Sequence, residues 1–115
     1  MNKRLRLRHP ADFARIKREG VVFRHPLIIV SAMPNQLAHN RYGFITSKHL
    51  GNAVVRNRVR RLLRESVRNH HEALQTGYDV VIVGRKSVVG KPFEVVLVTL
   101  EKAFKKLALM RETET

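Results

Sequence analysis

The sequence predicts an α+β protein, a two-layer α/β sandwich in which elements in the order α-β-β-α-β-α surround a mixed sheet. Two runs rich in β-branched residues, 21–33 and 78–84, predict strands. Apolar residues recur at helical spacing in 53–75 and again in 92–107, which predicts two long helices. Because 115 residues is a common size for one domain, we expect a single domain over 1–115.

The two ends of the chain are polar, and the first helix begins shortly after the N-terminus. Residues 1–9 carry four cations and no acid, which predicts a flexible basic arm, and 111–115 predict a frayed tail. Proline is well suited to the first turn of a helix and glycine to its end. We therefore expect a short helix from Pro10 to Glu19 that stops at Gly20.

Two strands are expected between the first helix and the long second one. In 21–33, Pro26 indicates an edge strand, or a strand that begins just after the proline. Residues 41–48 alternate between apolar and polar, which predicts a second strand. We expect the two strands to pair as an antiparallel hairpin.

The second half of the chain has clear start and stop signals. Asn52 can cap a long helix over 53–75, and Gly77 can terminate it. The apolar run 78–84 is typical of a strand that is covered on both faces, so we expect it at the centre of the sheet. Pro92 can open the last helix.

The charge balance indicates a polyanionic partner. The chain has 23 Lys and Arg against 9 Asp and Glu, a formal net charge of +14. Nucleic acid is the favoured partner, because each neutralised phosphate releases a counterion; an acidic membrane surface or protein is a weaker alternative. The lack of cysteine excludes disulfides, thiolate zinc sites and thiol nucleophiles. No apolar run has the length of a signal peptide core or membrane span, so we expect a cytoplasmic protein without a membrane partner.

The most informative segment is 52–68, where six arginines accompany a single acid, Glu65. Placed on a helix, the apolar positions gather on one side and most arginines cover the neighbouring side. The apolar side holds Val55, Val59, Leu62, Leu63 and Ser66, and the basic side holds Arg56, Arg60, Arg61, Arg64 and Arg68. Arginine can bind a phosphate through two hydrogen bonds and can also stack on bases. Since like charges one turn apart repel, this pattern favours a helix that meets RNA or DNA.

The ordered run from Gly51-Asn52-Ala53 through Arg56-Asn57-Arg58-Val59-Arg60-Arg61-Leu62-Leu63-Arg64-Glu65 resembles the signature helix of the bacterial ribonuclease P protein family. The other elements follow that family's order across nearly the whole chain. The resemblance implies a ribosomal-protein-like fold and a subunit of the endoribonuclease that removes 5′ leaders from precursor tRNA. It also implies that the catalytic centre is in the RNA, that magnesium acts in the RNA-protein holoenzyme, and that the protein alone binds no cofactor. The residues expected to contact the catalytic RNA are Arg56, Asn57, Arg58, Arg60, Arg61, Arg64 and Arg68.

The resemblance further implies a cleft between the first helix and the sheet, which holds the single-stranded leader of precursor tRNA. Its expected residues are Phe13, Lys17, Ser47, Lys48, Arg85 and Lys86. Aromatic side chains can stack on unpaired bases, and cations can follow the backbone. Members of the family often have a second aromatic where this chain has Lys17, so a phosphate contact is expected there. For Phe13, a place in the core is an equal alternative.

Other sites and functions are less favoured. GRKSVVGK at 84–91 has five residues between its glycines where a phosphate-binding P-loop has four, and Pro92 follows where that motif has Ser or Thr. The scattered histidines and acids predict no metal site, no catalytic residue in the polypeptide and no small-molecule cofactor. A basic ribosomal protein, or another nucleic-acid-binding structural protein without specificity, fits the composition equally well and is the alternative function.

Overall fold

Three α-helices and four strands make up most of residues 2–111, the part of the chain that this computed structural model describes. The α-helices are α1 (Pro10–Glu19), α2 (Ala53–His70) and α3 (Phe93–Lys106). The strands are β1 (Val21–Arg24), β2 (Ile28–Pro34), β3 (Arg41–Ile45) and β4 (Tyr78–Gly84). Short 3-10 turns are η1 (Lys3–Leu5), η2 (Lys48–Leu50), η3 (His71–Ala73) and η4 (Lys86–Val88). The frayed tail expected at 111–115 lies outside the described residues, except for Arg111.

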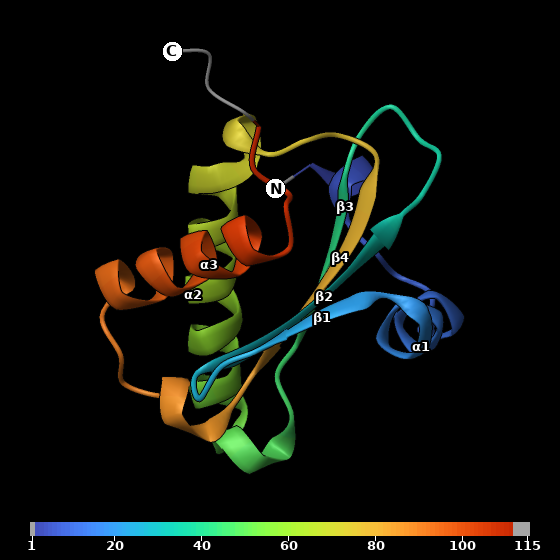
Figure 1. The fold of residues 1–115 in the computed structure, drawn as a ribbon. Helices are drawn as coiled ribbons and strands as arrows, with labels where there is room; N and C mark the ends of the chain where they lie inside the picture. Colours follow the sequence, from blue (N-terminus) through green and yellow to red (C-terminus); the bar gives the residue numbers. More distant parts are fainter. Residues whose placement is uncertain (1, 112–115) are drawn as a thin grey trace.

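The four strands form one mixed sheet in the order β1-β2-β4-β3. The first two pairs are antiparallel, whereas β3 and β4 are parallel. The α1 helix lies on one side of the sheet, and α2 and α3 lie on the other (Figure 1). The predicted α+β class and mixed sheet are confirmed, but the helices cover both faces instead of forming the single layer expected.

Most of the start and stop signals act where the sequence predicts. The α1 helix begins at Pro10 and ends before Gly20. Asn52 caps α2, because its side-chain oxygen accepts a hydrogen bond from the backbone N–H of Val55 at 3.0 Å. The α2 helix ends at His70, earlier than expected, and η3 continues the chain toward β4. The β4 strand has the predicted bounds and pairs on both sides.

The prediction for the first strands is wrong in two respects. Residues 21–33 form two strands instead of one, because the chain turns at Pro26, where His25 N–H donates to the carbonyl of Ile28 at 2.9 Å. Proline has a fixed φ and no N–H to donate, so it fits this turn better than a strand interior. The hairpin is therefore β1-β2. The β3 strand does not pair with β2, because the more apolar β4 lies between them.

The sheet separates two hydrophobic clusters. The larger one lies between the sheet and the helices α2 and α3, and includes Tyr42, Leu63 and Phe104. The smaller one lies beneath α1 and contains Leu7, Ile16 and Val81. Successive residues of β4 contribute to opposite clusters, which explains why this strand is apolar along its whole length.

The N-terminal segment is fastened to the sheet, in contrast to the flexible arm that the sequence predicts. Arg6 forms a bridge with Tyr42 beside β3, and Leu7 N–H donates to the carbonyl of Tyr42 at 2.9 Å. The Leu7 side chain is buried in the smaller cluster. Leu5 is half-buried against the larger cluster, so the two leucines fasten this segment to opposite faces of the sheet.

Candidate RNA interface

The arginines of α2 carry charge that the protein itself leaves almost entirely unneutralised. Within residues 2–111, Arg68 is the one arginine of this helix in an ion pair, with Glu65 at 3.6 Å. Both side chains of that pair are substantially exposed, so their attraction is weak. The helix therefore presents a concentration of guanidinium groups that is available to an outside anion.

These arginines point to more than one side of the helix. Arg60 and Arg64 line a hollow of about 210 Å³ beside β3, which we call the Phe13 hollow. Arg58 and Arg61 lie on the opposite flank, at the edge of a groove next to α3. Asn57 and Arg68 are exposed between these flanks. A partner that uses the whole set has to contact two flanks of α2 as well as its outer surface.

Two of the arginines are held in position by their surroundings. One terminal nitrogen of Arg60 donates to Thr46 Oγ1 at 2.8 Å, and the other donates to Asn57 Oδ1 at 3.2 Å. Arg56 is half-buried, and its Nε finds no hydrogen-bond partner within the described part of the chain. An unsatisfied buried N–H is costly, so an added acceptor at Arg56 would be stabilising.

The Phe13 hollow combines an aromatic ring with cations. It is lined by Arg6, Leu7, Arg8, Phe13, Tyr42, Gly43, Phe44, Arg60 and Arg64. The Phe13 ring lies against the backbone of Gly43, where an added Cβ would overlap Cε1 and Cζ of the ring. Glycine is thus required at this position for the ring to lie where it does. Phe13 is half-buried, so it packs onto the smaller cluster and also lines the hollow.

The other residues expected in the leader cleft lie at a different place, beyond the carboxyl ends of the parallel strands. The register pairs Ile45 of β3 with Val83 of β4, so the chain segments that follow leave the same edge of the sheet. Ser47, Lys48, Arg85 and Lys86 are all exposed there, and none of them lines the Phe13 hollow.

Two of the cations expected in the leader cleft, Arg85 and Lys17, have more closely defined surroundings. A terminal nitrogen of Arg85 donates to the carbonyl of His25 at 3.3 Å, which ties this side chain to the β1-β2 turn. Lys17 is exposed on α1, one helical turn after Phe13. Between α1 and the strand ends lie Ile45 and Val83, which are half-buried on the α1 side of the sheet. The expected cleft residues thus border a strip of partly exposed apolar surface.

Sequence reasoning missed several residues of the Phe13 hollow. Arg6 and Arg8 fall in the segment that the sequence predicts to be a flexible arm, and Tyr42 and Gly43 are predicted only as strand residues. The available signal was the pair of leucines among the cations, since apolar side chains indicate that a segment packs against the core.

The opposite ends of β3 and β4 carry a cluster of arginines that is neutralised internally. Arg41 donates to both carboxylate oxygens of Asp79 at 2.8 Å, and Arg15 lies 3.5 Å from the same group. The Asp79 side chain is fully buried and also accepts a hydrogen bond from Asn35 at 3.0 Å. Burial alone would raise the pKa of Asp79, but the hydrogen bonds from Arg41 and Asn35 and the nearby positive charges outweigh it, so the pKa lies below its usual value.

The described residues offer neither a metal site nor a membrane-spanning helix. Over the stretch from Asn2 to Arg111, no three His, Asp or Glu side chains come together in a way that could hold a metal ion. No helix in that stretch is both long and apolar enough to cross a bilayer.

The sequence matches known proteins over nearly its whole length. The family model for ribonuclease P matches residues 1–108. The ribonuclease P protein component of Caldanaerobacter subterraneus subsp. tengcongensis is 39% identical over 112 residues, which cover 97% of each chain. The corresponding component of Chloroflexus aggregans is 35% identical over 116 residues, covering 100% of this chain and 86% of that protein.

Solved structures agree with these matches. The RNase P protein of Staphylococcus aureus superimposes with a TM-score of 0.84 at 28% identity, covering 93% of this chain and 98% of the other. The RNase P protein of Thermotoga maritima gives a TM-score of 0.80 at 28% identity, covering 88% and 96%. These similarities favour a ribonuclease P role over that of a basic ribosomal or unspecific nucleic-acid-binding protein. The chain belongs to the bacterial ribonuclease P protein family and is the protein subunit of that tRNA-processing endoribonuclease.

Proposed function

We propose that α2 binds the RNA subunit of ribonuclease P through Arg56, Asn57, Arg58, Arg60, Arg61, Arg64 and Arg68. The observation that carries this proposal is the lack of internal partners: in the described residues, Arg68 alone of the six arginines pairs with a carboxylate. Guanidinium groups that project from a rigid helix can bind phosphates through two hydrogen bonds each. Folded RNA supplies such phosphates at high density.

The leader of precursor tRNA is proposed to lie along the α1 side of the sheet. Phe13 offers a ring for stacking, and Lys17 lies one turn further along α1. Ser47, Lys48, Arg85 and Lys86 provide polar and cationic groups at the far edge. An aromatic ring near a line of cations is a common way to hold an unpaired strand without reading its sequence.

Within this proposal, magnesium belongs to the RNA-protein holoenzyme and assists hydrolysis of one phosphodiester bond. The residues of this chain position the two RNAs and neutralise phosphate charge. Because arginines and magnesium ions both neutralise phosphates, the protein should matter most when magnesium is scarce.

Reconstitution tests the proposed function directly. The protein is added to a bacterial ribonuclease P RNA at low magnesium, and release of the leader from precursor tRNA is followed over time. We expect faster cleavage with the protein, and the enhancement should shrink as magnesium is raised. Equal rates with and without protein at every magnesium concentration would contradict the proposal.

The leader site has its own test. Phe13→Ala should weaken binding of leader-bearing precursor tRNA to the holoenzyme by about 10-fold, because base stacking is lost, and should leave mature tRNA binding unchanged. Phe23→Ala is the matched control, since Phe23 is also half-buried but lies on β1, stacked on His25. Equal losses for precursor and mature tRNA in Phe13→Ala would refute the assignment of the site.

A further inference from the structure

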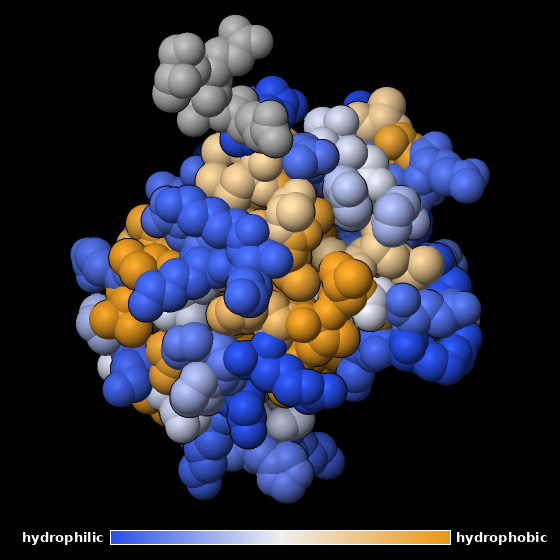
Figure 2. Space-filling view, in the orientation of Figure 1, coloured by the Kyte–Doolittle hydropathy of each residue, from blue (hydrophilic) through white to orange (hydrophobic). Residues whose placement is uncertain are grey.

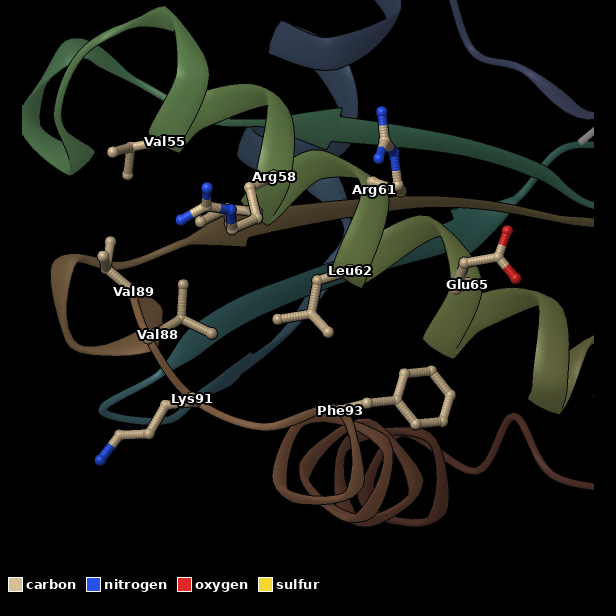
Figure 3. Close-up of a pocket in the computed structure, with 11 residues that line it drawn as sticks. Val55, Arg58, Arg61, Leu62, Glu65, Val88, Val89, Lys91 and Phe93 are labelled. Atoms are coloured by element: carbon tan, nitrogen blue, oxygen red, sulfur yellow. The ribbon is translucent and has the colours of Figure 1, made fainter.

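A groove about 480 Å³ in volume runs between α2 and the segment that leads from η4 into α3. Its lining residues are Val55, Arg58, Val59, Arg61, Leu62, Glu65, Val88, Val89, Gly90, Lys91 and Phe93. Figure 3 shows Leu62 pointing into the groove from α2, with Phe93 at the start of α3 and Val88 to the left of Leu62. The charged ends of Arg58, Arg61 and Lys91 point away from this interior. The groove therefore has an apolar interior and a cationic rim.

The interior is open to solvent, although its lining is apolar. Val89 is 37% exposed, and Phe93 and Leu62 are both half-buried. Gly90 lines the groove without a side chain, and an added Cβ there would meet no atom within 4 Å. In Figure 2, hydrophobic surface interrupts the hydrophilic surface on the side of the molecule where α3 crosses α2. An exposed apolar patch that is rimmed by polar residues is typical of a binding site.

We propose that this groove, floored by Leu62, Val89 and Phe93 and rimmed by Arg58, Arg61 and Lys91, receives an unstacked nucleobase of the ribonuclease P RNA. The proposal rests on the function proposed above and adds a second kind of contact to it. A base has flat apolar faces, while the phosphates on either side of it are anionic. An unstacked nucleotide therefore fits a groove that has an apolar floor and cations on both sides.

The positive charge of the rim favours RNA as the occupant over a partner protein or a second copy of this chain. An apolar helix of a partner protein, or a second copy of this chain, would bring no dense negative charge to Arg58, Arg61 and Lys91. The one acid of the rim, Glu65, lies 3.6 Å from Arg68 and is thereby partly neutralised. The groove is also continuous with the arginine-bearing surface of α2, because Arg58 and Arg61 belong to both. RNA that covers α2 would therefore reach the groove.

Two substitutions test the groove, one by charge and one by shape. Val89→Asp places a carboxylate on the exposed floor and should weaken binding of the ribonuclease P RNA by about 10-fold. Phe93→Leu keeps an apolar side chain and the net charge but removes the ring. Val95→Asp is the matched control, since Val95 is 40% exposed on α3 and lines a different hollow, beside His25 and Leu27. The control should bind RNA within about 2-fold of the unaltered protein, as expected for a distant exposed site.

Chemical probing of the RNA identifies the base. The 2′-hydroxyl reactivity of each nucleotide is compared in complexes with the unaltered protein and with each variant, at saturating protein. One or two unpaired nucleotides should be protected by the unaltered protein and by Val95→Asp, and should become reactive with Val89→Asp and Phe93→Leu. Thermal unfolding of the variants checks that each one remains folded under the binding conditions.

Three outcomes would overturn the inference. The first is unchanged RNA affinity for Val89→Asp, and the second is an unchanged reactivity pattern in both groove variants. The third is a dimer of the unaltered protein, at the concentration used for binding, that Val89→Asp separates into monomers without loss of RNA affinity. In each case, a loss of RNA affinity on replacing Arg60 and Arg61 by Ala would leave the proposed function standing.

Discussion

Two groups of arginines in this molecule have opposite electrostatic roles. At the amino ends of β3 and β4, Arg15 and Arg41 surround the buried carboxylate of Asp79. On α2, five of the six arginines have no carboxylate partner within the chain from residue 2 to residue 111. The residue type is the same, but one group neutralises charge within the fold and the other leaves charge for a partner.

The difference shows what makes a basic residue a candidate for RNA binding. The net charge of +14 says only that cations are in excess. The structure shows which cations are already paired with a carboxylate. A buried carboxylate holds its arginines in place, because leaving either charge unpaired would be costly. Substitutions in the first group should therefore alter stability, and substitutions in the second should alter RNA affinity.

Asp79→Ala should have the largest effect. It leaves Arg41 without its two short hydrogen bonds and should lower the free energy of unfolding by about 3 kcal/mol. Denaturant unfolding measures the change. Asp12→Ala removes a more exposed carboxylate, 3.3 Å from Arg15, and should lower the free energy of unfolding by less than about 1 kcal/mol. Similar losses in both variants would show that the Asp79 cluster is not specially important for the fold.

Replacing Arg60 and Arg61 together by Ala should weaken binding of the ribonuclease P RNA by about 30-fold and change stability little. The slope of log affinity against log salt should flatten by about one for each phosphate that an arginine no longer neutralises. Arg41→Ala sharpens the comparison, because it removes the same kind of charge from the neutralised cluster. It should lower stability and leave the salt slope unchanged. A flattened slope for Arg41→Ala would erase the distinction between the two groups.

Gly43→Ala should have an intermediate effect, because the added methyl group would overlap the ring of Phe13. Overpacking of this kind lowers stability by about 1 to 3 kcal/mol. At temperatures where the variant is folded, the displaced ring should also weaken binding of leader-bearing tRNA more than of mature tRNA. If Gly43→Ala lowered stability without any change in leader affinity, the hollow would have a structural role only.

The smallest expected effect is a change of the unfolding free energy with pH in the acid range. Because the folded-state pKa of Asp79 is lowered, its ionised form stabilises the fold at pH values above its unfolded pKa of about 3.9. That contribution is lost as the pH falls through the folded-state pKa. The difference in unfolding free energy between the unaltered protein and Asp79→Asn should thus be constant near neutrality and shrink below about pH 4. A difference that stays constant into acid would contradict the pKa direction.

Local signals in the sequence were sufficient for the elements that local chemistry determines. Pro10 and Gly20 bound α1, Asn52 caps α2, and the apolar run of β4 implies burial on both faces. The family resemblance also depended on a contiguous segment, the arginine-rich part of α2. Such features can be recognised without knowing what lies next to them in space.

Features that depend on distant contacts were missed. The pairing of β3 is decided by β4, which comes after α2 in the chain, so no property of 21–48 alone could place it. The hairpin at Pro26 was hidden because the residues on both sides form strands. The division of the α2 arginines between two flanks depends on where Phe13 and Phe93 pack, and both come from other helices.

The hydrogen bond from Leu7 to β3 also determines how far apart its two neighbouring arginines lie. Arg6 and Arg8 flank Leu7 on a segment whose backbone is extended at Arg6, and side chains two residues apart on an extended chain repeat about every 6.6 Å. Successive phosphates of an extended single strand recur at a comparable interval. The hydrogen bond between Leu7 and Tyr42 thereby sets the spacing of the two arginines along the Phe13 hollow, which both of them line.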